Sequence, residues 1–239
     1  AIKKTYFSIT VRIIASIVLV SAPIILIMQQ PDFGSSVIIM GVWLVMIFVS
    51  GMNKRAIVGL IIAGIIASSS GWFMLKNYQK ERLINFVNPE QDPLGSGYNV
   101  IQSIVAVGSG GMWGKGLGHG SQSQLNFLPE KHTDFIFAVF AEEFGFFGSA
   151  VALVLFGILF YRLKETARLA RDNFGYLMAV GISAMLFMQV LVNVGMNIGI
   201  APVTGVPLPF LSYGGSSMMV VLASIGIIQS IYIRRIKSF

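Results

Sequence analysis

Four carboxylates in this sequence occupy positions where a charged side chain could do chemistry. Asp92 lies in the segment 88–98, which is rich in proline and glycine, and Asp32 stands directly before a long apolar run. Glu142 and Glu143 fall inside another apolar run. A positioned carboxylate can act as a general base, pair with a cation or cap a helix, so the surrounding pattern has to distinguish these roles.

The two aspartates each have a structural explanation beside the chemical one. Asp92 precedes Pro93, which restricts its backbone to an extended or turn conformation. On the residues alone, a turn role for Asp92 is favoured over a catalytic one. Asp32 has the residue type and charge that suit a helix N-terminus, so a capping role is favoured there.

The two glutamates are expected to lie deep in a helix. At 1.5 Å per residue they would sit about 12 Å below a helix start at Asp134. An ionised side chain near the centre of a bilayer costs about 2.5–3.5 kcal/mol. We therefore expect Glu142 or Glu143 to face the bundle interior and to support a polar cavity.

A stripe of polar residues marks a further apolar run. Gln189, Asn193 and Asn197 recur every four residues and therefore share one helix face. Hydrogen bonding between helices is favoured as their role over direct substrate contact.

These residues belong to a chain with the composition of a membrane protein. Of its 239 residues, 55% are hydrophobic and 11% charged, and the mean hydropathy is +0.77; a soluble domain carries about 25% charged residues. A hydrocarbon core of about 30 Å needs roughly 20 apolar residues per span. Six candidate spans meet or approach this length: 13–28, 33–52, 56–75, 135–161, 174–201 and 214–233. The sequence predicts an all-α polytopic protein with a single integral membrane domain over residues 1–239 and six transmembrane helices.

The first run also has the pattern of a secretory signal, because Lys3 and Lys4 precede it. No small-residue cleavage site follows the run before Gln29, so a true span is favoured. Its Pro23 is tolerated as a kink where neighbouring helices satisfy the freed carbonyl.

The basic residues indicate the orientation of the spans. If both termini are cytoplasmic, the inside segments hold Lys3, Lys4, Arg12, Lys54, Arg55, Arg162, Lys164, Arg168, Arg171, Arg234, Arg235 and Lys237, which are 12 of the 17. This asymmetry follows the positive-inside rule, so the net charge of +7 reflects topology and no nucleic-acid partner is expected. The absence of cysteine excludes a thiolate metal site, and the presence of only two histidines argues against a histidine-rich one.

Three segments would then lie outside the cytoplasm: a short turn at 29–32, a large extracytoplasmic loop at 76–134 between the third and fourth helices, and the segment 202–213. The large loop holds seven glycines between Gly108 and Gly120 but neither G-x-G-x-x-G nor a P-loop, so we expect it to fold tightly over the membrane surface. The segment 202–213 is apolar and contains three prolines, which predicts a re-entrant or lip-like element.

Four blocks of sequence, in order, resemble the signature motifs of the SEDS family (shape, elongation, division and sporulation), with the RodA branch closest and the FtsW branch second. They are the segments 30–35, 88–98, 128–138 with the following Glu142-Glu143, and 205–216. The resemblance covers essentially the whole chain. It implies that these six spans are the last six of the ten that family members have, the N-terminal spans of the family being missing here.

The resemblance implies a peptidoglycan glycosyltransferase of the bacterial inner membrane that polymerises lipid II during cell wall elongation. The transfer would invert the sugar centre and release polyprenyl pyrophosphate. The implied partners are a class B penicillin-binding protein (a transpeptidase), the elongation machinery and membrane lipids. Asp92 would then be the catalytic residue, and Asp32 would support the core cavity.

Pyrophosphate needs positive charge or N–H donors at the outer surface. The expected substrate-binding residues are Lys80, Arg82, Lys115, Lys131 and His132, and the expected cavity supports are Asp32, Glu142, Glu143, Gln189 and Asn193. A solvated loop charge is the alternative for each basic residue. A divalent cation such as Mg²⁺ is compatible with this chemistry but has no sequence signal.

Two other functions fit parts of the pattern. A lipid II flippase or transporter would place its site near the bilayer midplane, at Glu142, Glu143 and the polar stripe. A non-catalytic scaffold of the elongation or division machinery would leave Asp92 replaceable. The glycosyltransferase is favoured because the densest motifs lie outside the bilayer.

The charge distribution makes a testable prediction about topology. A reporter fused after Arg168 or Phe239 should report the cytoplasm, and a reporter inserted near Ser121 should report the outside, because most basic residues then lie inside. Dual-reporter activity in intact cells measures this, and the opposite labelling would contradict the predicted orientation.

Overall fold

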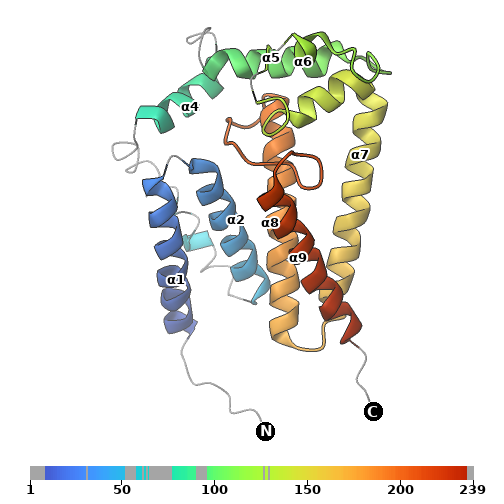
Figure 1. The fold of residues 1–239 in the computed structure, drawn as a ribbon. Helices are drawn as coiled ribbons and strands as arrows, with labels where there is room; N and C mark the ends of the chain where they lie inside the picture. The colour runs from blue at the N-terminus through green and yellow to red at the C-terminus, as the bar shows by residue number, and fades with distance from the viewer. Residues whose placement is uncertain are drawn as a thin grey trace.

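The computed structural model describes residues 9–30, 32–51, 58–60, 62, 64, 77–89, 96–125, 127, 128 and 130–235. Within these residues every regular element is a helix, so the predicted all-α class is confirmed there (Figure 1). Five long helices form a bundle and three shorter ones lie across one end of it, which we name the end layer. The bundle helices are α1 (Ile9–Gln29), α2 (Phe33–Val49), α7 (Ile136–Arg168), α8 (Asn173–Asn197) and α9 (Gly215–Ile233). The short helices of the end layer are α4 (Asn77–Val87), α5 (Ser96–Ser109) and α6 (Ser121–Gln124). The loop 110–118, the turn 130–135 and the part of α7 before Gly145 belong to the end layer as well.

Three of the bundle helices, α7, α8 and α9, are long and apolar enough to cross a membrane. The helix α2 and the segment Ile14–Gln29 of α1 are shorter apolar helices. The third predicted span, 56–75, lies almost entirely outside the described residues.

The helix α8 is the centre of the packing. It contacts α2 and α7 along their lengths, and α9 packs on both α7 and α8. One core cluster joins α7 and α8 to the 202–213 segment, a second joins α7, α8 and α9, and a third joins α5 to the start of α7. Small residues allow α2 to approach closely: a Cβ at Gly41 would lie 2.6 Å from Met188 Cε. Close approach at small residues is how apolar helices associate in lipid, where no hydrophobic force drives them together.

The helix α7 is broken at Gly145, whose φ of 66° and ψ of −163° are not helical. Its 33 residues would span about 50 Å as one straight helix, well beyond an apolar core of about 30 Å. Instead the part before the break lies across the end of the bundle and the part after it descends beside α8 (Figure 1). The predicted depth of Glu142 and Glu143 was therefore wrong, because both precede the break and lie in the end layer.

The glycine-rich loop 110–118 fills the break in α7. Two α7 carbonyls and two α7 N–H groups that the break releases all find partners in this loop. The hydrogen bonds run from Lys115 N to Glu142 O (3.0 Å), Gly116 N to Glu143 O (3.0 Å), Phe146 N to Gly111 O (2.8 Å) and Phe147 N to Met112 O (3.2 Å). A Cβ at Gly110 would collide with Ala141 O and one at Gly114 with Glu143 O, so this approach requires glycine.

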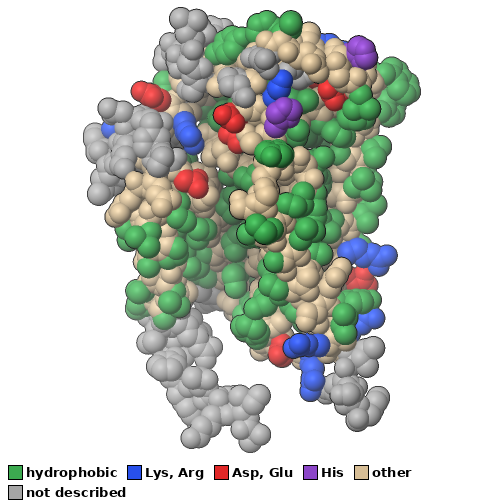
Figure 2. Space-filling view, in the orientation of Figure 1, with side chains coloured by type: hydrophobic (Ala, Val, Ile, Leu, Met, Phe, Trp, Pro, Cys, Tyr) green, Lys and Arg blue, Asp and Glu red, His purple; other side chains and the backbone are tan. Residues whose placement is uncertain are grey.

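Charged side chains gather at the two ends of the molecule. Figure 2 shows acidic, basic and histidine side chains in the upper part of this face and a second group near the lower end, with mostly apolar surface between them. The start of α1 and the end of α9 both lie at the lower end, opposite the end layer (Figure 1). An apolar belt between two polar ends is the surface that a bilayer requires.

The break in α7 makes a prediction about stability. Gly145→Ala should lower the free energy of unfolding by about 2 kcal/mol or more, because its φ is strained for any other residue and its Cβ would lie 2.7 Å from the Trp113 carbonyl carbon. Thermal unfolding in detergent or nanodiscs measures this. The matched control is Gly157→Ala, on the same helix with open space around it, which should not be destabilised. Equal unfolding temperatures for the two variants would contradict the interpretation.

Candidate functional site

The end layer holds all the basic residues that the sequence assigns to substrate. Lys80 and Arg82 lie on α4, Lys115 lies in the glycine-rich loop, and Lys131 and His132 lie in the turn before α7. Asp92 itself lies outside the described residues. Its position in the sequence is between the end of α4 and the start of α5.

The turn 130–135 is held in place through three consecutive carbonyl groups. Tyr213 N donates to His132 O (2.8 Å), and Ser212 Oγ donates to Thr133 O (2.7 Å). Asp134 O accepts from two α8 side-chain amides, at 3.0 and 3.1 Å. The backbone of this turn is therefore tied both to α8 and to the segment before α9.

Those two amides belong to the predicted polar stripe on α8. Asn193 Nδ2 also donates to Val206 O (2.8 Å), and Asn197 Oδ1 accepts from Ala138 N in the first turn of α7 (3.1 Å). Both asparagines are fully buried. They connect α8, the start of α7 and the 202–213 segment, which is the interhelical role that was favoured. Gln189 behaves differently, because its buried Oε1 has no hydrogen-bond partner.

The side chain of Asp134 is a half-buried acid facing mixed charges. Burial raises the pKa of this carboxyl, and negative Glu130 raises it further; Arg82 and a hydrogen bond from Thr133 oppose that shift. Asp134 therefore keeps its proton to a higher pH than a solvated aspartate does. Its Oδ2 also lies close to the backbone of Gly205, since a Cβ there would be 3.6 Å away.

Arg82 has a buried donor without an acceptor. Its Nη1 is inaccessible to solvent and makes no hydrogen bond. It also makes no ion pair within 4.0 Å among the described residues, although it is close enough to Asp134 to affect that pKa. A buried cationic donor that lacks a partner is costly, so this arrangement favours an anionic ligand.

Lys115 and Glu142 form a pair within the end layer. Lys115 Nζ lies 2.8 Å from Glu142 Oε1, and the Glu142 side chain is completely buried. The same oxygen accepts from Gln122 N (3.0 Å), Ser121 Oγ (3.3 Å) and Ser109 Oγ (3.5 Å). The partners of Glu142 therefore come from the glycine-rich loop, from α5 and from the start of α6, and the Lys115 ammonium group is already paired within the protein.

Two other predicted cavity supports accept hydrogen bonds from backbone N–H groups. Asp32 Oδ1 accepts from Ser35 N (3.0 Å) and caps α2, the role favoured from its position. Glu143 Oε1 accepts from Gly118 N (3.0 Å), which holds the far end of the glycine-rich loop.

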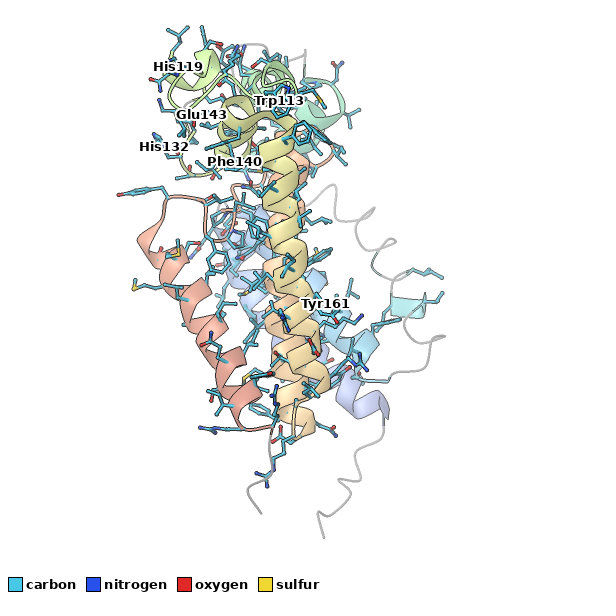
Figure 3. The ribbon with its side chains drawn as sticks, turned by 90° about the vertical axis from the view of Figure 1, so that its right-hand side faces the viewer. Trp113, His119, His132, Phe140, Glu143 and Tyr161 are labelled. Atoms are coloured by element: carbon cyan, nitrogen blue, oxygen red, sulfur yellow. The ribbon has the colours of Figure 1, made fainter. Side chains whose placement is uncertain are left out.

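A pocket of about 420 Å³ opens where the turn before α7 meets the start of α9. Exposed His132 lines it together with Ile136, Tyr213 and Met218. The segment 202–213 forms part of its wall; this segment has no helix and buries Val206 and Leu208 against the bundle. Figure 3 places His132 near the upper end, close to Glu143 and Phe140 in that view.

Sequence reasoning missed Asp134 as a candidate, although it lies in one of the family-like motifs. The available signal was its position as the last charged residue before an apolar run. Ser109, Ser121 and Gln122 were also missed, because nothing in the sequence relates these residues to Glu142. Among the described residues, no three His, Asp or Glu side chains cluster as a metal site would require.

Comparisons with known proteins support a family assignment. The family described as cell cycle protein, which covers FtsW, RodA and SpoVE, matches residues 2–236. The chain is 46% identical over 221 residues to the peptidoglycan glycosyltransferase MrdB of Escherichia coli K12, covering 92% of this chain and 60% of MrdB. It is 42% identical over 213 residues to stage V sporulation protein E of Bacillus subtilis 168, covering 89% of this chain and 58% of that protein.

Solved structures give the same relationship. A chain from a peptidoglycan synthase complex, described as coordinating polymerisation and crosslinking, superposes with a TM-score of 0.76 at 32% identity, covering 93% of this chain and 62% of that one. The rod shape determining protein RodA of Thermus thermophilus gives a TM-score of 0.61 at 27% identity, covering 100% and 60%. The chain thus spans about three fifths of the length of these relatives. With three helices of membrane length, the relationship makes this an integral membrane protein.

The Lys115–Glu142 pair makes a prediction about stability. Lys115→Met or Glu142→Gln alone should lower the free energy of unfolding by up to about 3 kcal/mol, because each leaves a desolvated group without its partner. The double variant should lose less than the sum of the two. Thermal unfolding of the four proteins measures the coupling.

The control is the Arg162–Glu165 pair on α7, whose atoms are 3.8 Å apart and whose side chains are 75% and 43% exposed. Its coupling should stay below about 1 kcal/mol. Additive effects for Lys115 and Glu142 would show that the buried pair does not hold the loop.

Proposed function

The chain belongs to the FtsW, RodA and SpoVE family, as its four motifs predicted, and on that premise we propose that the full-length protein is a peptidoglycan glycosyltransferase that polymerises lipid II in cell wall elongation. The observation that carries the proposal is Arg82 in the end layer, a half-buried side chain whose Nη1 is buried and has no hydrogen-bond acceptor. A lipid-linked pyrophosphate presents its charge at this height, just beyond the apolar belt. An enzyme that acts on such a substrate needs a preorganised cation there.

The proposed reaction is a single inverting displacement. The acceptor sugar hydroxyl attacks C1 of the donor sugar from the face opposite the pyrophosphate. The hydroxyl proton passes to the Asp92 carboxylate as the new glycosidic bond forms. The C1–O bond to polyprenyl pyrophosphate breaks, and its electron pair leaves with the phosphate oxygen. A positioned base of this kind contributes about 10²–10⁴ in rate.

The basic residues divide into two groups in this proposal. Arg82 and Lys80 lie on the same helix and bind the leaving pyrophosphate. Lys131 and His132, in the turn that α8 fixes, contact the sugar or phosphate, and His132 does so from the pocket that it lines. Lys115 acts indirectly, because its ammonium group is already paired with Glu142.

A divalent cation such as Mg²⁺ would depend mainly on the pyrophosphate oxygens. In the part of the chain that the structure describes, no three carboxylate or histidine side chains gather closely enough to supply its ligands.

The proposed setting is the bacterial inner membrane, with six spans in this sequence and both ends cytoplasmic. In support, the helix α2 runs away from the end layer, whereas α4 lies within it (Figure 1). The proposed partners are a class B penicillin-binding protein, which would crosslink the new strand, and the elongation machinery. The similarity to a chain of a peptidoglycan synthase complex supports the first of these partners.

Asp92→Asn in the full-length protein tests the catalytic assignment. The substitution keeps the size of the side chain and most turn hydrogen bonding but removes its basicity. Polymerisation of labelled lipid II should fall by about 10²–10⁴. Membrane insertion, partner binding and lipid II binding should be retained, because the pyrophosphate contacts do not involve this carboxylate.

The matched control is Asp172→Asn, the same change at the N-cap of α8 at the opposite end of the bundle, which should leave polymerisation unchanged. A near wild-type rate for Asp92→Asn would reject the base assignment. Loss of expression would favour a turn role. Translocation of lipid II without chain growth in the wild-type protein would favour a flippase, and neither activity would favour a scaffold.

A further inference from the structure

An exposed aromatic cluster lies where α7 breaks. The Trp113 ring stacks on Phe147, with ring centroids 4.7 Å apart and an interplanar angle of 24°, and Phe146 meets Phe147 edge to face at 6.2 Å. Trp113 is 78% exposed and Phe146 61% exposed. Leu117 and Met112 of the same loop are exposed as well. Figure 3 shows Trp113 at the upper end of α7. Large apolar side chains grouped this way on a surface indicate a contact site.

The cluster continues the apolar face of the descending part of α7. Phe147 shares one helix face with four exposed residues at spacings of 4, 7, 8 and 11, namely Val151, Val154, Leu155 and Ile158. In an integral membrane protein, an exposed face of aliphatic residues on a membrane-length helix lies at the depth of the hydrocarbon core. Because Trp113 stacks on Phe147, it lies at the upper edge of that face.

The height of the cluster agrees with the thickness of a bilayer. Arg162 is the first charged residue below the break, and it lies 15 residues after Phe147. At 1.5 Å per residue, Phe147 is about 22 Å above Arg162. An apolar core of about 30 Å whose lower boundary is near Arg162 therefore includes Phe147 and ends just above it. Tryptophan concentrates at this boundary, with its ring in the apolar region and its N–H near the head groups.

The loop can enter this boundary because its polar groups are satisfied internally. The N–H groups of Lys115 and Gly116 bond to the carbonyls of the α7 break, and Gly114 N bonds to Gly110 O at 2.8 Å. The Lys115 charge is neutralised by Glu142 at 2.8 Å. Irregular backbone at membrane depth is tolerated only when protein satisfies it in this way.

We propose that Trp113, Leu117, Phe146 and Phe147 form a membrane anchor that inserts into the leaflet on the side of the end layer and contacts its acyl chains. The anchor fixes the height of the glycine-rich loop, and with it the Lys115–Glu142 pair, relative to the bilayer. Lipid is favoured over a protein partner because the cluster continues an apolar face that is already in the bilayer.

Depth-dependent quenching of tryptophan fluorescence tests the proposal. The protein is the full-length chain in lipid nanodiscs, with Trp113 as its only tryptophan and the others, Trp43 and Trp72 among them, replaced by Phe. Nanodiscs containing phosphatidylcholine brominated on its acyl chains should quench Trp113 several-fold more strongly than acrylamide does.

The matched control is His119→Trp in a Trp113→Phe background. His119 is exposed just after the glycine-rich loop, its ring bonds to Leu117 O at 2.9 Å, and Figure 3 shows it apart from Trp113. Acrylamide should quench the tryptophan at position 119 more strongly than brominated lipid does. A second probe, Leu117→Trp in the same background, should be quenched by brominated lipid as Trp113 is. Agreement between the two probes shows that the result does not come from a local disturbance at one position.

Each outcome decides the proposal. Preferential quenching of Trp113 and of the Leu117→Trp probe by brominated lipid supports the anchor. Acrylamide quenching of Trp113 equal to that of the His119 control places the cluster in water and overturns it. Protection of Trp113 from both quenchers places the cluster against protein and also overturns it.

Discussion

A helix that breaks at the boundary of a membrane must find new partners for the backbone groups that the break releases, because lipid offers none. In this protein the break is at Gly145, and the partners are the backbone groups of the glycine-rich loop. The loop approaches so closely that Gly110 and Gly114 leave no room for a side chain. The buried Glu142 then binds the same loop through Lys115. The arrangement of the end layer depends on this one connection.

A second connection runs through α8. Asn193 and Asn197 bind the Asp134 carbonyl, and through it they set the start of α7. Asn193 also holds the 202–213 segment at Val206. Fully buried amides that satisfy several carbonyls at once give a rigid junction, since leaving any of these groups unpaired is costly. The side chains around the proposed site are therefore carried by backbone with little freedom to move.

The two connections separate structural charges from charges that remain available. Lys115 and Glu142 neutralise each other, and Asp32 and Glu143 bind backbone N–H groups. Arg82 has a buried Nη1 without a hydrogen-bond acceptor, next to an acid whose pKa is raised. For the proposed transferase, Arg82 is therefore available to bind an anion at the height where a lipid-linked pyrophosphate lies. The apolar faces below it keep the protein in the bilayer.

The sequence by itself determined the features that depend on local pattern. Apolar runs of membrane length predicted the helices, the spacing of Asn193 and Asn197 predicted a shared face directed at other helices, and the position of Asp32 predicted a helix cap. These succeed because helical periodicity and capping involve neighbours only a few residues apart. The break at Gly145 could not be predicted, since one glycine in an apolar run is equally compatible with a continuous helix. Its φ is positive only because a loop from 30 residues earlier in the chain packs into the gap, and that same packing moved the glutamates from the predicted span into the end layer.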